Sequence, residues 1–515
     1  MSVRGPASFG MAKRTRVVHM VGIGGIGMSG IAEVLINLGY RVTGSDKKTS
    51  DTTRRLTALG GHVILGHDEH NVEGTDVVVV SSAVRDDNPE VQMARRLKIP
   101  VIRRAEMLAE LMRLKEGIAV GGTHGKTTTT SLVAWLLQAG GLDPTVVVGG
   151  KVNRLGTTAK LGQGPFLVAE ADESDGSFLH LSPTIAVVTN IDPEHLDHYQ
   201  GGIEEIRDTF VSFVNRIPFY GLAVLCGDHS GVQAILPRVV RRRVLYGFSP
   251  QAEVQARNIE FDGPRTTFEL WYAGTNHGRF LLNMLGEHNV ANALAALTVA
   301  HELQVPMSVA KDALAEFDGV ERRFSVRGHA RDVMVVDDYG HHPEEIRATL
   351  RGARSAYPKR RMIAVFQPHR YTRTRDHIEE FATAFHDAEI VIVTPIYAAG
   401  EDPIEGVTSA YLAEALRRHG HRDVREVSDV DEAVTMLLSD ARRGDLVITL
   451  GAGDVNRAAS RLAEALEQPE SIAANAATSF GQDGAPGVAA GVSANSEPGV
   501  SRDEAAEPKR GKGTP

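Results

Sequence analysis

Two glycine-rich loops, each between an apolar run and a helix-like segment, constrain the fold of this chain more than any other feature. The first, VGIGGIGMSG at 21–30, follows the apolar run VVHMV, and the second, GGTHGKTTTT at 121–130, follows GIAV. Each pattern predicts a buried strand that turns sharply into a helix, with backbone N–H groups free at the helix N-terminus. Fully apolar, β-branched strands that alternate with helices are typical of a parallel sheet.

Similar strand and loop units recur along the chain and predict three α/β domains. We expect an N-terminal Rossmann-like domain over 14–116, a central P-loop-type ATPase domain with a mostly parallel sheet over 117–324, and a C-terminal Rossmann-like domain over 325–467. Within the central region, RNIEFDG at 257–263 and TTFELWYAG at 266–274 predict two strands of a small mixed or antiparallel addition, and residues 286–304 predict a helix. Residues 1–13 should form a flexible arm, and the Ala-, Gly-, Ser- and Pro-rich tail 468–515 should be disordered.

Composition excludes several classes of protein. The net charge of −9 gives no general attraction to nucleic acid or to anionic membrane. Cys226 is the only cysteine, which rules out an intrachain disulfide and fits a reducing compartment. No apolar run approaches the ~20 residues of a membrane helix, and the N-terminus lacks a secretory signal. We therefore expect a cytoplasmic protein without nucleic-acid binding or membrane insertion; its oligomeric state is not indicated.

The first glycine loop is compatible with three interpretations. Gly22, Gly24 and Gly27 match G-x-G-x-x-G, and Asp46 ends the next strand near the position of a ribose-binding acid. The pattern is found in nicotinamide dehydrogenases. It could equally serve strand–helix packing alone, or hold the diphosphate of another nucleotide, because backbone N–H groups do not discriminate between bases.

The second loop resembles a P-loop but departs from the strict pattern, because Val120 stands where the first glycine is required. Gly125, Lys126 and Thr127 nevertheless provide close backbone approach to phosphate, an ammonium group and a hydroxyl for Mg²⁺. An acidic cluster at the end of a later strand, 170–175, offers a metal-binding carboxylate, and His195 follows the next strand. We expect nucleoside triphosphate binding here. A non-catalytic nucleotide sensor could lose Lys126 without consequence. The presence of Lys126 therefore favours an enzyme over a sensor.

Nine stretches in a fixed order make the chain resemble the Mur ligases. They are GIGGIGMSGIA, GTHGKTTTT, EADESDGSFL, TNIDPEHLDHY, GEHNVANALAA, FDGVERRFSVRG, DDYGHHPEEI, FQPHRYTRT and LGAGD, within residues 21–454. The resemblance implies an ATP-dependent ligase of peptidoglycan precursor synthesis that joins L-alanine to the carboxylate of UDP-N-acetylmuramate through an acyl phosphate. The alternative is a recycling ligase that joins a tripeptide to the same UDP-sugar.

The resemblance also implies a division of labour between the two loops, with UDP-N-acetylmuramate at the first and ATP at the second. Expected UDP-sugar-binding residues are Gly22, Gly24, Gly25, Gly27, Ser45, Asp46, His67 and Ser82. Expected ATP-binding residues are Gly121, Thr123, Gly125, Lys126, Thr127, Thr128, His288, Asn289, Asn292 and Arg323, with Arg322 as a further phosphate contact.

For the remaining roles, the resemblance implies Mg²⁺ as cofactor and a separate set of residues for the amino acid. The expected metal ligands are Thr127, Glu170 and His195; the catalytic residues Lys126, His195 and His341; and the amino-acid-binding residues Tyr339, His341, Arg370 and Arg373. Several Mur ligases hold a second magnesium with a carbamylated lysine. No lysine lies between Lys160 and Lys311, which excludes that bridge and favours the L-alanine-adding branch.

Overall fold

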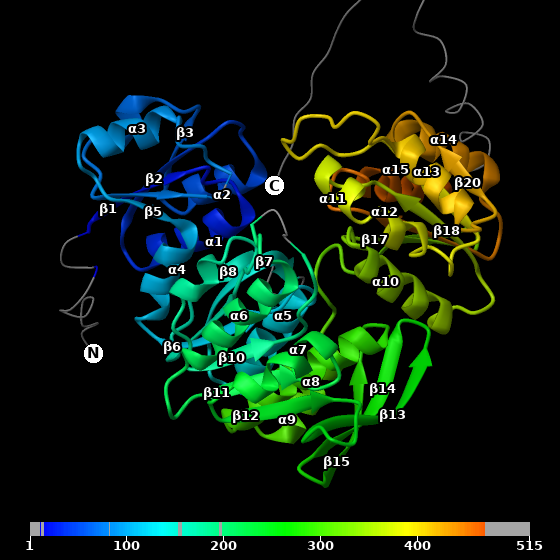
Figure 1. The fold of residues 1–515 in the computed structure, drawn as a ribbon, viewed down its shortest axis with the longest axis horizontal. Coiled ribbons are helices and arrows are strands. Elements are labelled where there is room, and N and C mark those ends of the chain that lie inside the picture. The colour runs from blue at the N-terminus through cyan, green and yellow to red at the C-terminus, as the bar shows by residue number, and fades with distance from the viewer. Residues whose placement is uncertain (1–10, 12–14, 82, 153–156, 195–197, 469–515) are drawn as a thin grey trace, which may run out of the picture. The chain divides into compact units, whose positions relative to one another are not determined.

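The computed structural model of this protein describes residue 11 and residues 15–81, 83–152, 157–194 and 198–468. Strands of these residues form three sheets, of five, ten and six strands, which follow one another along the chain (Figure 1). The predicted α/β class with mostly parallel sheets is confirmed. The domain boundaries at 116, 324 and 467 stay predictions, and most of the predicted arm and tail lies outside the described residues.

The first sheet is parallel throughout, in the order β3-β2-β1-β4-β5. Its elements are β1 (Val17–Val21), α1 (Ile26–Asn37), β2 (Arg41–Asp46), α2 (Asp51–Ala58), β3 (His62–Leu65), β4 (Val77–Val80), α3 (Pro89–Arg96), β5 (Val101–Arg103) and α4 (Arg104–Met112). Alternate residues of the central strand β1 pack on opposite faces: Val18 and Met20 join a core with α1 and α4, and Val21 joins a core with Ala94 of α3. The sheet is therefore covered on both faces, as its apolar strands predict.

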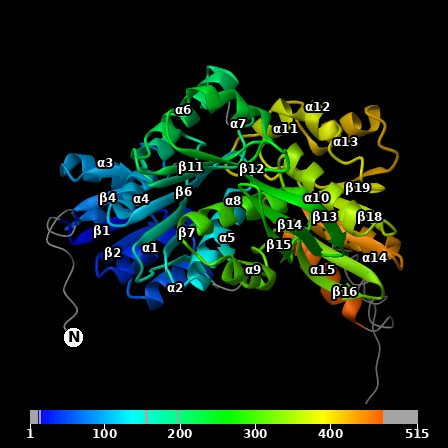
Figure 2. The same ribbon diagram turned by 90° about the horizontal axis from the view of Figure 1, so that it is seen from below.

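The second sheet has the order β15-β14-β13-β12-β11-β10-β6-β9-β7-β8, and its pairs from β13 to β7 are parallel. Its first elements are β6 (Glu116–Gly121), α5 (Lys126–Ala139), β7 (Thr145–Val152), β8 (Thr157–Lys160), β9 (Phe166–Glu170), β10 (Ile185–Val188), α6 (Gly202–Asn215), β11 (Leu222–Cys226), α7 (Ser230–Ile235) and β12 (Arg243–Gly247). Helices α6 and α7 cover one face, and α5 covers the other (Figure 2).

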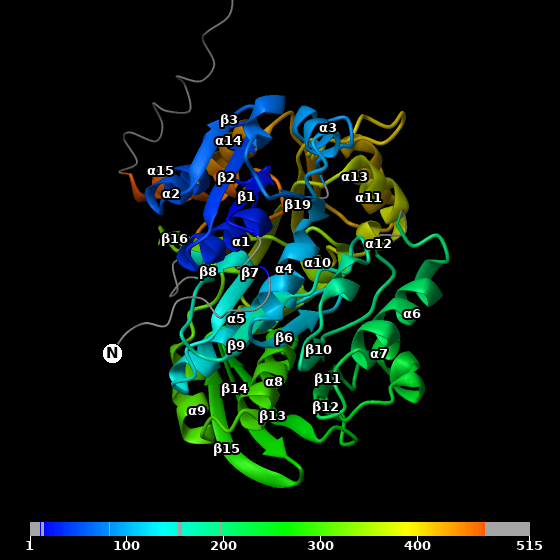
Figure 3. The same cartoon turned by 90° about the vertical axis from the view of Figure 1, so that its left-hand side faces the viewer.

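The same sheet continues into an antiparallel meander, β13 (Val254–Asp262), β14 (Arg265–Tyr272) and β15 (Thr275–Leu282), seen at the lower end of Figure 3. The two predicted strands are confirmed, and the sequence had given no signal for the third. The predicted helix is α8 (Glu287–Glu302), which packs on α5 and is followed by α9 (Met307–Glu316).

The third sheet has the order β16-β17-β21-β18-β19-β20, with only the β16–β17 pair antiparallel. Its elements are β16 (Ser325–Ala330), β17 (Val333–Asp338), α10 (Pro343–Ala356), β18 (Arg361–Phe366), α11 (Tyr371–Asp376), α12 (Ile378–Ala382), β19 (Ile390–Val393), α13 (Ser409–Arg418), β20 (Val424–Glu426), α14 (Val430–Asp440), β21 (Asp445–Leu450) and α15 (Asn456–Glu467). Helices α10, α12 and α13 cover one face, and α14 and α15 cover the other. In the part of the chain that is described, no helix is both long and apolar enough to cross a membrane.

Candidate active site

The second glycine loop joins β6 to α5 and requires glycine at two positions. Gly122 has a φ of 131°, and a Cβ there would lie 2.0 Å from the Thr189 hydroxyl oxygen. Gly125 has a φ of 80°, and a Cβ there would lie 2.6 Å from the side-chain oxygen of Asn292. Other residues are excluded by both the backbone and the lack of space. The turn places Lys126 at the start of α5, where free N–H groups favour phosphate.

Two further predicted loop residues differ in their surroundings. The Thr123 hydroxyl accepts a hydrogen bond of 2.9 Å from the Asp192 N–H, which ties the loop to the end of β10. Gly121 is buried at the end of β6, where a Cβ would lie 3.5 Å from Phe210 and from Phe213. Gly121 lines none of the cavities described below, so its position indicates packing beneath the loop.

Lys126 is held by Glu173, a member of the acidic cluster 170–175 that was expected to offer a metal ligand rather than a partner for Lys126. Its ammonium group donates to both carboxylate oxygens of Glu173, at 2.8 and 2.9 Å, and to the carbonyls of Gly122 and Thr123, at 2.7 and 3.1 Å. Burial would lower the pKa of Lys126, but the charges of Glu173 and Asp172 outweigh burial and raise it. Burial raises the pKa of Glu173 to about 7, against the opposing effect of Lys126. Glu173 therefore pairs with the ammonium group expected to contact ATP phosphates.

Glu170 is the last residue of β9, and one of its carboxylate oxygens makes no hydrogen bond. Its Oε1 is buried without a hydrogen-bond partner, and a Cβ on Gly149 would lie 2.4 Å from its Oε2. Burial raises the pKa of Glu170, while hydrogen bonds from the Thr127 hydroxyl and the Gly149 N–H partly offset the rise. Magnesium takes oxygen ligands and is usually bound by one or two carboxylates plus substrate phosphates. The unpartnered oxygen beside Thr127 therefore fits the predicted magnesium site.

A cavity of about 590 Å³ over this loop brings together residues from three predicted sets. Its lining includes Thr123, Gly125, Lys126, Thr127, Glu170, Arg323, Tyr339, His341, Arg370 and Arg373. The ATP and metal residues other than Arg323 lie at the ends of strands β6 and β9, and the amino-acid residues follow β17 and β18. Arg323 precedes β16, whose first residue pairs with the end of β17. Ligands of open parallel sheets gather at the carboxyl ends of strands, which is where all these residues lie.

Within the amino-acid set, His341 has a fixed orientation. Its Nδ1 lies 3.0 Å from the carbonyl oxygen of Tyr339 and must donate to it, which leaves Nε2 as the acceptor nitrogen. Burial lowers the pKa of His341 to about 3, so the imidazole is neutral. Arg370 adopts a φ of 73° at the start of α11. The neighbouring His369 stacks on Tyr397 with ring centroids 5.6 Å apart, and burial lowers its pKa to about 4.

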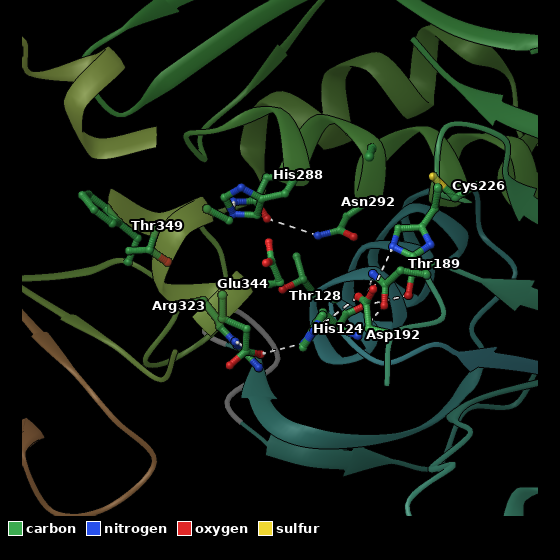
Figure 4. Close-up of a pocket in the computed structure, with 18 of the residues that line it drawn as sticks. His124, Thr128, Thr189, Asp192, Cys226, His288, Asn292, Arg323, Glu344 and Thr349 are labelled. Carbon is green, nitrogen blue, oxygen red and sulfur yellow. Dashed lines mark hydrogen bonds and ion pairs between the residues drawn. The ribbon is translucent and has the colours of Figure 1, made fainter. Parts of the chain in front are cut away.

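A second cavity, of about 330 Å³, continues from the first and shares His124, Gly125, Arg323 and Glu345 with it (Figure 4). The predicted residues that line this cavity are Gly125, Thr128, His288, Asn289, Asn292 and Arg323. Burial lowers the pKa of His288 to about 4, with a further contribution from Arg323, so His288 is neutral. The cavity is mostly apolar with a few polar groups, as expected for a nucleoside.

The first glycine loop opens on a third cavity, of about 220 Å³, lined by Gly25, Gly27, Arg104, Glu170 and Asp172 among others. Glu170 and Asp172 also line the large cavity, so the two glycine loops open on adjoining spaces. A Cβ at Gly27 would lie 2.9 Å from the Arg104 guanidinium, which itself pairs with Asp172 at 3.1 Å. The sequence had not marked Arg104, which is the cation nearest this loop in the described contacts.

The other described residues of the predicted UDP-sugar set contact the protein itself. Gly22, with a φ of 76°, donates from its N–H to the carbonyl of Ser45 at 2.8 Å. Asp46 accepts a hydrogen bond of 2.9 Å from the Gly24 N–H and lines a separate cavity of about 230 Å³. Asp46 therefore fixes the conformation of the loop.

Ser45 and His67 both contact a buried carboxylate, Glu90. The Ser45 hydroxyl donates to Glu90 at 2.7 Å, and the Nδ1 of His67 lies 2.9 Å from the same oxygen. Ser45 is fully buried. Burial would raise the pKa of Glu90, but hydrogen bonds from His19, Asn71 and Ser45 lower it overall. The side chain of Ser45 thus supports the strand end beneath the loop.

Three other predicted site residues, Ser82, His195 and Arg322, are not placed in any of these cavities. Ser82 and His195 lie outside the described residues, so their roles stay predictions. Arg322 lines neither the nucleotide cavity nor the large one. It donates instead to Asp337 at 3.1 Å and to the carbonyls of Gly451 and Gly453 at 2.7 and 3.2 Å. The expected phosphate contact of Arg322 is therefore not supported, because its donors are used within the third sheet.

Family models match three successive segments of the chain. The model described as "Mur ligase family, catalytic domain" matches residues 17–116, "Mur ligase middle domain" matches 120–300, and "Mur ligase, glutamate ligase domain" matches 322–453. Among curated relatives, the UDP-N-acetylmuramate–L-alanine ligase of Geobacter sulfurreducens is 59% identical over 451 residues, which are 88% of this chain and 98% of the relative.

Solved structures agree with these matches. The UDP-N-acetylmuramate–alanine ligase of Thermotoga maritima is similar with a TM-score of 0.74 and 29% identity, over 87% of this chain and 98% of that one. A murein peptide ligase of Psychrobacter arcticus is similar with a TM-score of 0.64 and 25% identity, over 88% of this chain and 99% of that one. On the family models and the curated relatives together, this chain belongs to the Mur ligase family.

Proposed function

We propose that this chain joins the amine of L-alanine to the carboxylate of UDP-N-acetylmuramate, with conversion of ATP to ADP and phosphate, as a cytoplasmic step of peptidoglycan precursor synthesis. One observation carries the proposal: three adjoining cavities run from the first glycine loop, past Lys126 and Glu170, to the cavity around His288. A UDP-sugar, the reacting groups and a nucleoside would occupy them in that order. The names of the curated relatives support this choice of substrates.

At the first loop, we assign the diphosphate of the UDP-sugar to the backbone around Gly25 and Gly27, with Arg104 as a positively charged neighbour. The sugar carboxylate would then point through the cavity shared with Glu170 and Asp172. This assignment uses the loop for anion binding without any hydride transfer. It therefore removes the dehydrogenase interpretation, which would leave Lys126 and Glu170 without a role.

In the first chemical step, the sugar carboxylate attacks the γ-phosphorus of ATP to form an acyl phosphate and ADP. Two anions must meet, and Lys126 would neutralise part of their repulsion once ATP phosphates displace Glu173. Arg323 lines both the nucleotide cavity and the large cavity and is placed to contact the transferred phosphoryl group. Bound by Thr127 and Glu170, Mg²⁺ would supply further positive charge on the phosphate oxygens.

In the second step, the amine of L-alanine attacks the acyl carbon and phosphate leaves. Arg370 and Arg373 line the large cavity and can pair with the amino-acid carboxylate through their planar guanidinium groups. His341 presents Nε2 as a hydrogen-bond acceptor for the amine. With a pKa of about 3 it is a weak base in the absence of substrate, so we assign it to orienting the amine.

The test is release of ADP from Mg-ATP and UDP-N-acetylmuramate with L-alanine, glycine, L-serine or the tripeptide added separately. Release that favours L-alanine is expected. Release only with the tripeptide would place the chain with the murein peptide ligases instead. No release with any acceptor, despite ATP binding, would overturn the enzymatic assignment.

A matched pair of variants tests the division of labour between the loops. Lys126→Ala should abolish ADP release while UDP-N-acetylmuramate still binds, because Lys126 lies at the second loop only. Lys160→Ala is the control, since Lys160 pairs with Asp143 and Gln138 and lines no part of the proposed site. Equal loss of UDP-sugar binding and turnover in the Lys126 variant would contradict the proposed separation.

A further inference from the structure

A group of side chains at the second glycine loop was given no role in the proposed reaction, although His124 and Glu194 line the large cavity. It consists of His124 in the loop, Glu194 after β10, and His342 at the start of α10. One nitrogen or oxygen atom from each lies within 4.8 Å of the others. Among the residues that the structure describes, this is the one set of three or more His, Cys, Asp or Glu side chains with such convergence.

Both histidines of this group have buried ring nitrogens that make no hydrogen bond. His342 is 5% exposed, and neither of its ring nitrogens makes a hydrogen bond. Its Nε2 lies 3.3 Å from Oε1 of Glu194, and its ring centroid lies 4.8 Å from that of His124. The Nε2 of His124 is also buried without a hydrogen bond. Buried polar atoms are normally paired, so unpaired nitrogens on both rings need an explanation.

The charges around the group favour a cation. Asp192 lies 3.6 Å from Nε2 of His124, and Glu345 lies 3.7 Å from its Nδ1. Arg323 compensates Glu345 at 3.5 Å, and His229 contacts Asp192 at 3.2 Å. Negative charge therefore faces both imidazoles: Asp192 and Glu345 lie beside His124, and Glu194 lies beside His342.

The geometry points to a binding site for a divalent transition-metal ion formed by His124, Glu194 and His342, separate from the magnesium site at Thr127 and Glu170. Two imidazoles and one carboxylate are a donor set that Zn²⁺ accepts, whereas Mg²⁺ prefers oxygen ligands. With bonds of about 2.0–2.1 Å, two ligands of a tetrahedral ion lie about 3.3–3.4 Å apart. The separation of 3.3 Å between His342 and Glu194 matches this value. The ligand atom of His124 lies within 4.8 Å of both and would move closer when the ion binds.

Such an ion would join parts of the chain that belong to different sheets. His124 and Glu194 follow strands of the second sheet, and His342 precedes a helix that packs on the third. Occupancy would therefore tie the loop that binds ATP to the segment that carries the proposed amino-acid residues. Zinc should raise the thermal midpoint of the protein and slow any separation of the two sheets.

The test measures binding of Zn²⁺ alone to the untagged full-length chain, by equilibrium dialysis in excess Mg²⁺ so that the magnesium site is filled. Replacement by Co²⁺ adds a spectroscopic readout, because ligand-field bands of four- or five-coordinate Co²⁺ are far stronger than those of the hexaaqua ion. The variants are His342→Gln and Glu194→Gln, which each keep the size of the side chain. His301→Gln is the control, since His301 contacts Tyr272 and His277 outside the group.

We expect the unmodified chain and the His301 variant to bind one more Zn²⁺ than the two site variants. The Kd of that ion should rise by more than about 100-fold in each site variant, since even the loss of an outer-shell partner typically costs 10–100-fold. Equal stoichiometry and Kd in all four proteins, or no zinc bound by the unmodified chain, would overturn the site. None of these measurements depends on turnover, so they are independent of the proposed reaction.

Discussion

Replacing Glu173 by glutamine isolates the effect of the carboxylate that holds Lys126. In the structure this carboxylate receives two hydrogen bonds from the ammonium group, at 2.8 and 2.9 Å. ATP phosphates must take its place when they contact Lys126. Glutamine keeps the shape of the side chain and one acceptor oxygen but removes the charge. We therefore expect Glu173→Gln to bind ATP more tightly than the unmodified protein.

The magnitude follows from the pairing and from the pKa of Glu173. A hydrogen bond to a charged group contributes about 1.5–3 kcal/mol, and the lower end applies because Lys126 keeps its carbonyl partners. A free energy at this lower end corresponds to about a tenfold change in the Kd for ATP, in protein molecules whose Glu173 carboxylate is ionised. Burial raises the pKa of Glu173 to about 7, so about nine in ten carboxyl groups are ionised at pH 8 and about one in ten at pH 6. The variant should bind ATP about fivefold more tightly at pH 8 and about equally at pH 6.

The assay is calorimetric titration with Mg²⁺ and a non-hydrolysable ATP analogue, without UDP-sugar, at both pH values. Asp175→Asn is the matched control. Asp175 lines the same cavity, but its carboxylate accepts from the Ser177 N–H at 3.0 Å and faces Arg103 at 3.8 Å. The control should show no change in affinity specific to pH 8. If Glu173→Gln binds the analogue no more tightly than the unmodified protein at pH 8, competition between Glu173 and phosphate is refuted.

Three further predictions concern stability and the tail. Arg322→Ala should lower the free energy of unfolding by about 1–3 kcal/mol, because the fully buried Asp337 loses a charged partner. Urea unfolding measures this free energy, and an unchanged midpoint would mean that the pairing contributes nothing. Gly44→Ala should lower the free energy of unfolding by about 1–3 kcal/mol through overpacking, since its Cβ would lie 2.6 Å from Cδ1 of Ile23. A urea midpoint equal to that of the unmodified chain would show that the strand can shift without cost. Deletion of 468–515 should leave the rate of ADP release unchanged, since every residue assigned to the site precedes the tail; a lower rate would assign the tail a role in turnover.

The local features of the site could be predicted because they depend on short-range rules. Glycines at Gly122 and Gly125 signal a turn that other residues cannot make, and the apolar run before them signals a buried strand. The same reasoning predicted an acidic cluster at the end of β9, whereas the choice of Glu170 within it came from the family resemblance. In the meander, the third strand was missed because TNHGRFLL is polar over its first five residues, and only Phe280 and Leu282 are buried.

Pairings across the chain could not be read from the sequence. Glu173 and Lys126 are 47 positions apart, and Ser45 and Glu90 are 45 positions apart. Lys126, the acidic cluster that contains Glu173 and Ser45 were each noted separately, but nothing in the sequence indicated which side chains pair. Arg322 shows the same limit, because its neighbour Arg323 points into the cavities while Arg322 binds loops of the third sheet 129 and 131 positions away.

The sequence by itself determined the alternation of strands and helices, the two glycine-rich loops and the order of the family motifs, because backbone geometry and hydrophobic periodicity act over a few residues. Only the tertiary structure decided that the two loops open on adjoining cavities through Glu170 and Asp172, and that His124, Glu194 and His342 converge. Such proximity depends on strand order and on which strand ends share an edge. Burial then sets the charge states of Glu173 and His341, because the cost of removing a charge from water depends on every group packed around it.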